Sequence, residues 1–238
     1  VSPNRNYQWV PSNIWVGIGR MKSKEVIFPL EPLYKRKGIG YKQAKAISFH
    51  PEGDSSEAKP YILVEGVFGD NLGKQEKVTY DYLINATGPK LAFDMTEGLQ
   101  PATNKVYSVC TYDHAEHASE ALHKLIDQLK KSDKKSKILI GTGHAKATCQ
   151  GAAFEYILNV EKELQKFGVR DKAEITWISN EYELGDFGMD GMLMEYNGFN
   201  MKSKDMVEMI FEDRDIKWIL GARSEEHTSE LQSRRRIS

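Results

Sequence analysis

The chain of 238 residues has few cysteines, nearly balanced charge and no long apolar segment. Its two cysteines, Cys110 and Cys149, are too few for a disulfide framework and lack the Cys-x-x-Cys spacing of a structural zinc site. The net charge of −1 provides no overall basic field that would favour nucleic-acid binding. No apolar run approaches the roughly 18 residues that a membrane-spanning helix needs. The composition therefore predicts a globular protein whose two thiols are either buried or redox-active.

Turn residues divide the first part of the chain into short segments. Residues 1–40 alternate apolar pieces with Pro and Gly, which predicts loops around a short helix or turn. Residues 41–88 contain three β-like runs, YKQAKAISFHP, YILVEGVF and VTYDYLINATG, separated by stretches of turn-forming residues. This pattern predicts a small antiparallel β-meander over 41–88 that ends in a buried strand, YLINATG.

The second part of the chain alternates helix-like and strand-like patterns. A helix is predicted over 113–135, where apolar residues recur at three- and four-residue spacing. The strand-like KILIGTG, the helix-like CQGAAFEYILNVEKELQKFG and the strand-like AEITWIS follow, and Gly168 is the predicted helix stop. Such a β-α-β unit is the smallest nucleotide-binding piece of a doubly wound sheet. Residues 203–222 predict a further helix that runs toward another strand.

The turn after the first of these strands departs from a dinucleotide-binding fingerprint. Gly141 and Gly143 fit the first two glycines, but Lys146 stands where the third is expected, and Cys149 follows three residues later. A cysteine near a helix N-terminus has its thiolate stabilised by backbone N–H groups, and Lys146 and His144 would stabilise it further. Such a thiolate suits attack on sulfur or on a flavin. The alternative for Cys149 is a buried packing cysteine.

Four motifs, in the same order, resemble the sulfide:quinone oxidoreductase family of FAD flavoproteins. They are VSPNRNYQWVPSNIWVGIGR, INATGPKLAF, SVCTYDHAE and ATCQGAAFEY, and the resemblance covers residues 1–222. It implies an α/β, glutathione-reductase-like fold with two Rossmann-like FAD/NAD(P)-binding domains, both incomplete here. The implied domains are a partial FAD-binding domain at 1–112, which includes the meander 41–88, and a partial second Rossmann-like domain at 113–222. Because RSEEHTSELQS resembles a translated sequencing adapter, residues 223–238 are expected to be an artefactual tail.

The resemblance implies an FAD-dependent enzyme that oxidises sulfide to polysulfide or sulfur and passes electrons to a quinone, either ubiquinone or menaquinone. The implied route runs through a cysteine persulfide and a flavin C4a adduct. The resemblance also implies a peripheral protein of the bacterial inner membrane, attached to the membrane surface through a C-terminal region missing here. Neither nucleic acid nor a metal is expected as a partner. Whether the protein forms a homo-oligomer stays open. The first GxGxxG and a third cysteine are also expected outside the chain. The 238-residue polypeptide itself is therefore expected to be inactive and to bind FAD poorly.

The resemblance also assigns roles to individual side chains. Cys149 would form the redox-active bridge beside the flavin with the cysteine that is absent here, and Cys110 would lie nearer the sulfide entry. His114 and Glu155 match positions associated with proton handling, with helix capping and simple solvation as the respective alternatives. Asp186 stands where other members carry a histidine, which leaves the outer proton relay open.

The FAD contacts implied by the resemblance lie in three short segments. They are Ser2 and Pro3 near the adenosine ribose, Val10 and Pro11 against the flavin, and Thr87, Gly88 and Pro89 at a sharp turn. Gly88 permits close approach of a ligand to the backbone, and an ordinary strand-to-loop turn is the alternative.

Two other functions stay open at this point. One is a pyridine-nucleotide-dependent flavoprotein, such as a type II NADH dehydrogenase or a persulfide reductase, and the other is an inactive fragment. Lys146 argues against the first, because NADH needs close backbone approach at the third glycine.

Overall fold

The computed structural model describes residues 1–88, 90–101, 106–142, 150–196 and 198–221. The chain divides into two compact units. The first contains Val1–Trp9 and Lys24–Leu91, and the second contains Val10–Ser23 and the chain from Ala92 onward. Within the described ranges, no helix combines the length and the apolarity that crossing a membrane requires.

The first unit is built mainly from two antiparallel sheets. Its elements are β1 (Asn6–Gln8), α2 (Ser23–Val26), β2 (Ile27–Pro29), α3 (Leu30–Arg36), β3 (Ala44–His50), β4 (Tyr61–Gly66), η2 (Gly69–Asn71) and β5 (Gln75–Thr79). β1 pairs with β2, and the second sheet has the order β3-β4-β5 with both neighbouring pairs antiparallel. The predicted antiparallel meander is confirmed as β3-β4-β5, which spans Ala44–Thr79 rather than 41–88. The β1–β2 pair lies where only loops and a short helix or turn were predicted.

The meander ends earlier than the sequence predicts. β5 stops at Thr79, and residues 80–88, which contain the predicted buried strand YLINATG, form no strand. Tyr82 and Ile84 are 94% and 88% exposed. The prediction of a buried strand is wrong because a β-forming composition favours a strand only where a neighbouring strand and a covering layer are present. The described part of this unit supplies neither to residues 80–88.

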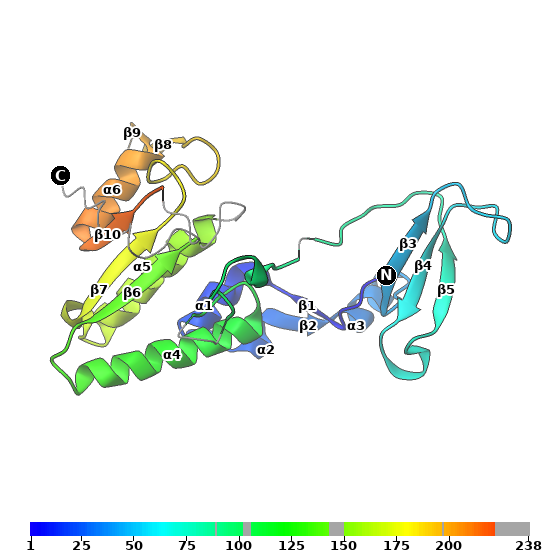
Figure 1. Cartoon of the computed structure of the whole chain (residues 1–238), viewed down its shortest axis with the longest axis horizontal. Coiled ribbons are helices and arrows are strands. Elements are labelled where there is room, and N and C mark those ends of the chain that lie inside the picture. The colour runs from blue at the N-terminus through cyan, green and yellow to red at the C-terminus, as the bar shows by residue number, and fades with distance from the viewer. Residues whose placement is uncertain (89, 102–105, 143–149, 197, 222–238) are drawn as a thin grey trace. The chain divides into compact units, whose positions relative to one another are not determined.

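The second unit combines helices with a parallel sheet. Its elements are η1 (Val10–Ser12), α1 (Asn13–Gly17), η3 (Phe93–Met95), α4 (Tyr112–Lys130), β6 (Ser136–Gly141), α5 (Gln150–Lys166), η4 (Arg170–Lys172), β7 (Ala173–Ile178), β8 (Leu193–Tyr196), β9 (Phe199–Lys202), α6 (Ser203–Asp213) and β10 (Ile216–Ile219). The sheet has the order β10-β7-β6 with both pairs parallel, and β8 pairs antiparallel with β9 (Figure 1). The predicted β-α-β unit is therefore confirmed as β6-α5-β7, and the later helix and strand as α6 and β10.

The core of the second unit lies where the helices pack on the sheet. Leu122 and Ile126 of α4 and Ile157 and Leu164 of α5 are buried in one cluster with Trp177 of β7. On both helices the buried residues recur at three-, four- and seven-residue spacing, so each helix buries a single stripe. This is the face that the sequence predicted for both helices.

The ends of the two long helices follow from what they bury. α4 ends at Lys130 rather than at the predicted residue 135, because Leu129 is its last buried residue and the lysines beyond it have no apolar side chain to bury. α5 ends at Lys166, and the predicted stop, Gly168, has a φ of +69° that a residue with a side chain rarely adopts. The Gly168 N–H donates to the Gln165 carbonyl, which closes the last turn.

Candidate functional site

The structure describes only one of the two cysteines, Cys110. Cys149 lies outside the described residues, as does the Gly143–Cys149 turn that raised the possibility of sulfur chemistry. Cys110 is a free, exposed cysteine two residues before α4, and its backbone N–H donates to the Ser108 hydroxyl at 3.1 Å. An exposed thiol on an irregular segment is accessible to a small nucleophile, which the predicted position near a sulfide entry requires.

His114 lies in the first turn of α4 and is partly buried. Its imidazole edge meets the ring of Phe93, with the ring centroids 5.5 Å apart and the planes at 70°. Its Nδ1 atom is buried and has no hydrogen-bond partner among the described residues. α4 begins at Tyr112 with Thr111 at the N-cap, so His114 is not the capping residue. A buried ring nitrogen without a partner is available to a proton donor or acceptor that the structure does not contain.

Glu155 is exposed on α5, which corresponds to the solvated alternative. Its backbone carbonyl accepts a hydrogen bond from the Asn159 side-chain amide at 2.9 Å. Burial, which would raise a carboxyl pKa and suit it to proton transfer, is absent within the described residues. The predicted proton-handling role of Glu155 therefore stays a prediction.

The segments that carry Cys110 and Glu155 meet at one glycine of α1. A Cβ atom added to Gly17 would lie 2.8 Å from Val109 Cγ1 and 3.0 Å from Tyr156 Cε2. The Tyr156 hydroxyl donates to the Gly17 carbonyl at 3.1 Å, and burial raises the pKa of Tyr156 well above its usual value. Val109 precedes Cys110 and Tyr156 follows Glu155, so two predicted site residues each adjoin a residue that packs on Gly17.

A second attachment holds the end of α1 between the two long helices. Arg20 forms a hydrogen-bonded ion pair with Glu163 of α5, whose side chain is only 2% exposed. A Cβ atom added to Gly19 would lie 2.5 Å from the His123 ring of α4, and Gly19 has a φ of +77°. The turn after α1 therefore contacts both α4 and α5, and it leaves no room for a side chain at Gly19.

The predicted FAD contacts in the first unit are exposed or partly exposed. The Ser2 backbone is joined to the start of β3, since its N–H donates to Lys42 and its carbonyl accepts from Ala44. Its hydroxyl accepts from the Asn4 N–H at 3.2 Å, and Pro3 beside it is exposed. These contacts fix the backbone near Ser2 while leaving the adjacent surface accessible.

Residues 85–88 form an exposed segment that a side-chain contact of Asn85 shapes locally. The Asn85 side-chain oxygen accepts from the Thr87 N–H at 3.3 Å and from the Thr87 hydroxyl at 3.0 Å. Gly88 has a φ of +71° and nothing within 4 Å of the position of an added Cβ. This open, exposed backbone fits the close approach that a dinucleotide requires. Pro89 lies outside the described residues.

Val10 and Pro11 belong to the second unit and are exposed in η1, immediately before α1. An exposed apolar pair on a short helix can present a flat surface to an aromatic ring, which fits the flavin contact predicted for them. The predicted FAD contacts are thus divided between the two units, and each group keeps an accessible surface.

Asp186, where the resemblance implies a histidine, has a local structural role. Its carboxylate oxygen accepts the N–H groups of Met189 and Asp190, each at 3.1 Å. Phe187 and Asp190 have φ values of 54° and 60°, so this turn includes two unfavourable backbone conformations that the Asp186 contacts help to hold. The carboxylate therefore stabilises a turn, which a histidine would do less directly.

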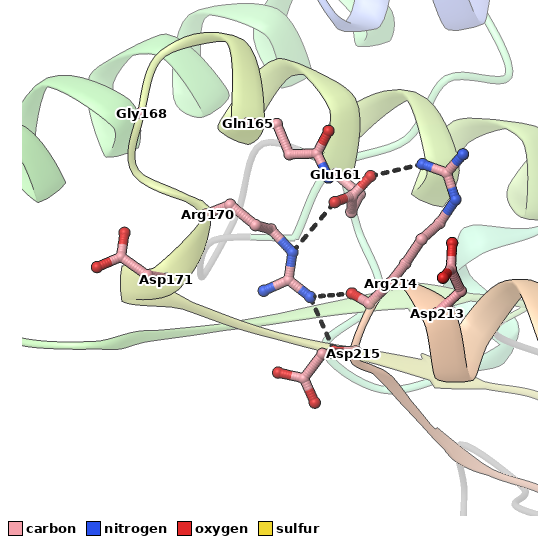
Figure 2. A pocket seen from close by; sticks show the side chains of 8 residues that line it. All are labelled: Glu161, Gln165, Gly168, Arg170, Asp171, Asp213, Arg214 and Asp215. Atoms are coloured by element: carbon pink, nitrogen blue, oxygen red, sulfur yellow. Dashed lines mark hydrogen bonds and ion pairs between the residues drawn. The ribbon is translucent and has the colours of Figure 1, made fainter.

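A cavity of about 530 Å³ elsewhere in the second unit is lined by none of the predicted site residues (Figure 2). Glu161 of α5, whose side chain is 1% exposed, faces two arginines across it. Arg214 Nη1 lies 2.7 Å from one carboxylate oxygen, and Arg170 Nε lies 3.4 Å from the other. Arg170 also donates to the carbonyls of Ala173, at 2.7 Å, and Asp215, at 2.8 Å. Arg170 Nε and the Glu161 oxygen that it faces form no hydrogen bond, so this contact is an ion pair alone. The cluster links α5 to η4 and to the turn between α6 and β10.

Comparison with known proteins places these observations in a family context. A sulfide-quinone reductase from Aquifex aeolicus (strain VF5) is 30% identical over 219 residues, which are 92% of this chain and 43% of that protein. The structure of the sulfide:quinone oxidoreductase from the same hyperthermophilic bacterium matches with a TM-score of 0.71 and 28% identity, over 93% of this chain and 44% of that one. The chain is a sulfide-quinone reductase homologue. No protein-family model matches it.

More distant structures support the fold of this sulfide-quinone reductase homologue. Plasmodium falciparum NDH2 in complex with NADH matches with a TM-score of 0.53 and 16% identity, over 92% of this chain and 42% of that chain. The same protein in complex with RYL-552 gives a TM-score of 0.58 and 15% identity. These likenesses establish an α/β fold of the FAD/NAD(P)-binding oxidoreductase kind, with small antiparallel sheets, as the sequence predicts. The homologue spans less than half the length of the relatives it matches.

Proposed function

We propose that the chain is part of a flavoprotein oxidoreductase that oxidises sulfide and reduces quinone. The observation that carries this proposal is the 30% identity to a sulfide-quinone reductase over 219 residues. The activity belongs to a protein longer than the 238 residues studied, because the chain corresponds to 43% of the relative.

Three of the predicted catalytic residues, Cys149, Cys110 and His114, have the following roles in this proposal. Cys149 is the sulfur nucleophile that carries the persulfide, and Cys110 receives sulfide at the exposed segment before α4. His114, with its buried and unpartnered Nδ1, exchanges a proton with the sulfur species. FAD, when bound, accepts two electrons and passes them to quinone, and the adduct at its C4a position remains an implication of the resemblance.

The residues of this chain proposed to contact the cofactor lie in three short segments. Ser2 and Pro3 would lie toward the adenosine end, Thr87, Gly88 and Pro89 would contact the cofactor where the sequence predicts a sharp turn, and Val10 and Pro11 would lie against the flavin. The open space around Gly88 supports this assignment, because a side chain there would obstruct a close approach. Peripheral attachment to the bacterial inner membrane, and any homo-oligomer, belong to the same proposal.

A second candidate is a pyridine-nucleotide-dependent flavoprotein. The likeness to NDH2 in complex with NADH favours it at the level of fold. Lys146 in place of the third glycine disfavours it, because a long side chain at that position obstructs the pyrophosphate. The two candidates differ in the reductant that the flavin accepts, so one experiment separates them.

The experiment replaces the matched 219-residue segment of the Aquifex aeolicus enzyme with this chain's counterpart. Bound FAD is measured first by visible absorbance, and sulfide or NADH is then added without oxygen while the flavin absorbance is followed. Sulfide should reduce the flavin, and Cys149→Ser should slow this step by roughly 10²-fold or more, because the redox-active bridge cannot form without Cys149.

The control is Ser132→Ala, a hydroxyl just beyond α4 that accepts from the Lys134 N–H and lies outside the predicted set. This variant should reduce at the parent rate. Reduction by NADH but not by sulfide would reverse the ranking of the two candidates. Retained sulfide turnover in Cys149→Ser, with FAD bound, would contradict the role of Cys149.

A further inference from the structure

The contact at Gly17 brings together three segments that are far apart in the sequence. Gly17 ends α1, Val109 lies in the segment before α4, and Tyr156 lies on α5. We propose that Gly17 and Tyr156 are positioning residues, which fix the segment carrying Cys110 against α5 at Tyr156, the residue that follows Glu155. For its catalytic meaning this inference rests on the proposed function.

The first reason is that the contact at Gly17 has no spare room. An added Cβ would lie 2.8 Å from Val109 Cγ1, closer than Cβ atoms approach carbon in proteins. Valine has a single side-chain torsion and is stiff, so it has little freedom to turn away. Relief must therefore come from a shift of the backbone at Val109, and Cys110 is the next residue.

The second reason is that the Tyr156 hydroxyl has a defined partner. Gly17 is the last residue of α1, where carbonyls lack a donor from the helix itself. Tyr156 supplies that donor at 3.1 Å, and burial, which raises its pKa, keeps the phenol protonated. The hydrogen bond thus sets the position of the end of α1 along α5.

The third reason is that a second contact on the same face of α5 prevents α1 from pivoting. Glu163 lies seven residues after Tyr156, which is two helical turns, so both side chains project from one face. Glu163 is buried and paired with Arg20, three residues after Gly17. Two attachments on α5 fix both position and orientation, whereas one would leave α1 free to rotate about it.

The consequence concerns Cys110 and Glu155 together. Each adjoins a residue in contact with Gly17, so a change at Gly17 moves one relative to the other. In a reaction that passes sulfur and protons between groups, a displacement of about 1 Å between those groups lowers the rate strongly. Gly17 and Tyr156 would act through Cys110 and touch neither sulfide nor FAD.

The test measures the rate at which Cys110 reacts with dithionitrobenzoate in the 238-residue chain carrying Cys149→Ser, so that one thiol reports. Gly17→Ala should change this rate at least about threefold, and the double variant Gly17→Ala/Val109→Ala should return it to within about twofold of Val109→Ala alone. Alanine at Gly17 introduces no backbone strain, since α1 is helical there and Gly17 has no positive φ. Any effect therefore comes from the methyl group.

The matched control is Gly151→Ala, a helical glycine of the same unit whose added Cβ meets nothing within 4 Å. It should leave the Cys110 rate within about twofold of the parent, as expected for independent sites. An unchanged rate in Gly17→Ala would overturn the proposal, as would a changed rate that Val109→Ala fails to restore. If Gly17→Ala does not fold, Tyr156→Phe decides, because it keeps the ring and removes only the donor; a parental Cys110 rate in that variant overturns the proposal.

The readout needs no FAD, sulfide or quinone. An unchanged Cys110 reaction rate in Gly17→Ala would therefore say nothing against sulfide oxidation by the grafted enzyme. Failure of the grafted enzyme to oxidise sulfide would, in turn, leave the positioning role of Gly17 in place. The two ideas can fail separately.

Discussion

At the scale of single residues, Glu181 is a buried carboxyl at the carboxyl edge of the parallel sheet. One of its oxygens accepts from the Ser179 hydroxyl at 3.1 Å, and that hydroxyl accepts from the Glu181 N–H at 3.2 Å. Burial raises the pKa of Glu181 above its ordinary 4.5, and the charge of Asp186 adds to this, although the Ser179 hydrogen bond opposes it. The folded state therefore favours the protonated carboxyl more than the unfolded state does.

This difference predicts the pH dependence of stability. A raised folded pKa gives stability that is fully present below the unfolded value of 4.5 and is lost as the pH rises through the folded value. Glu181→Gln cannot titrate, so it should gain stability relative to the parent as the pH rises from 4.5 to neutral. Urea unfolding at a series of pH values measures this, with the exposed Glu183→Gln as control. A difference between parent and Glu181→Gln that is independent of pH would count against the burial argument.

At the scale of elements, the Glu161 cluster ties α5 to η4 and to the turn between α6 and β10 (Figure 2). Glu161→Gln removes the charge that both Arg170 and Arg214 face, and it should lower the free energy of unfolding by about 3 kcal/mol, since it leaves poorly compensated charges behind. Glu155→Gln on the exposed face of the same helix should change it by less than about 0.5 kcal/mol. Urea denaturation followed by circular dichroism compares the two. Equal, small losses of unfolding free energy in the two variants would show that the Glu161 ion pairs contribute little net stability.

Periodicity predicted the elements that bury a continuous stripe. The meander strands and the β6-α5-β7 unit follow from alternating and helical spacing, because burial of one face imposes those periods. The exposed YLINATG segment shows the limit, since its composition indicates a strand but gives no information about a neighbouring one. The short β8–β9 pair was missed for a related reason: Leu193 and Phe199 are exposed, so no buried face imposes a period.

The residues discussed in the candidate site also divide into those that the spacing of apolar residues could have indicated and those that it could not. Glu161 had a signal that was overlooked, because it lies four residues after Ile157 and three before Leu164, on the buried face of α5. Gly17 had none, since what makes it tight is Val109 and Tyr156, the latter 139 residues away. The motif residues were found by resemblance to a family rather than from the spacing of apolar residues.

At the scale of the whole molecule, the two units differ in how much they bury. The core cluster on the meander of the first unit consists of Ala44, Ile62 and Val64 with two partly buried neighbours, whereas the second unit has a large cluster shared by three helices and a parallel sheet. Because stability grows with buried apolar area, the first unit should unfold at a lower urea concentration than the second. Hydrogen exchange of β4 and β7 amides at increasing urea measures the two midpoints separately.

A control separates local fraying from unfolding of a unit. β3 and β5 amides should lose protection together with those of β4, and β6 and β10 amides together with those of β7, because each sheet has its own core. Ile62→Ala, which removes part of the small core, should lower the β4 midpoint and leave the β7 midpoint unchanged. Coincident midpoints in the parent, or a parallel shift of both midpoints in Ile62→Ala, would contradict this prediction. Either result would show that the two units unfold in a single cooperative transition.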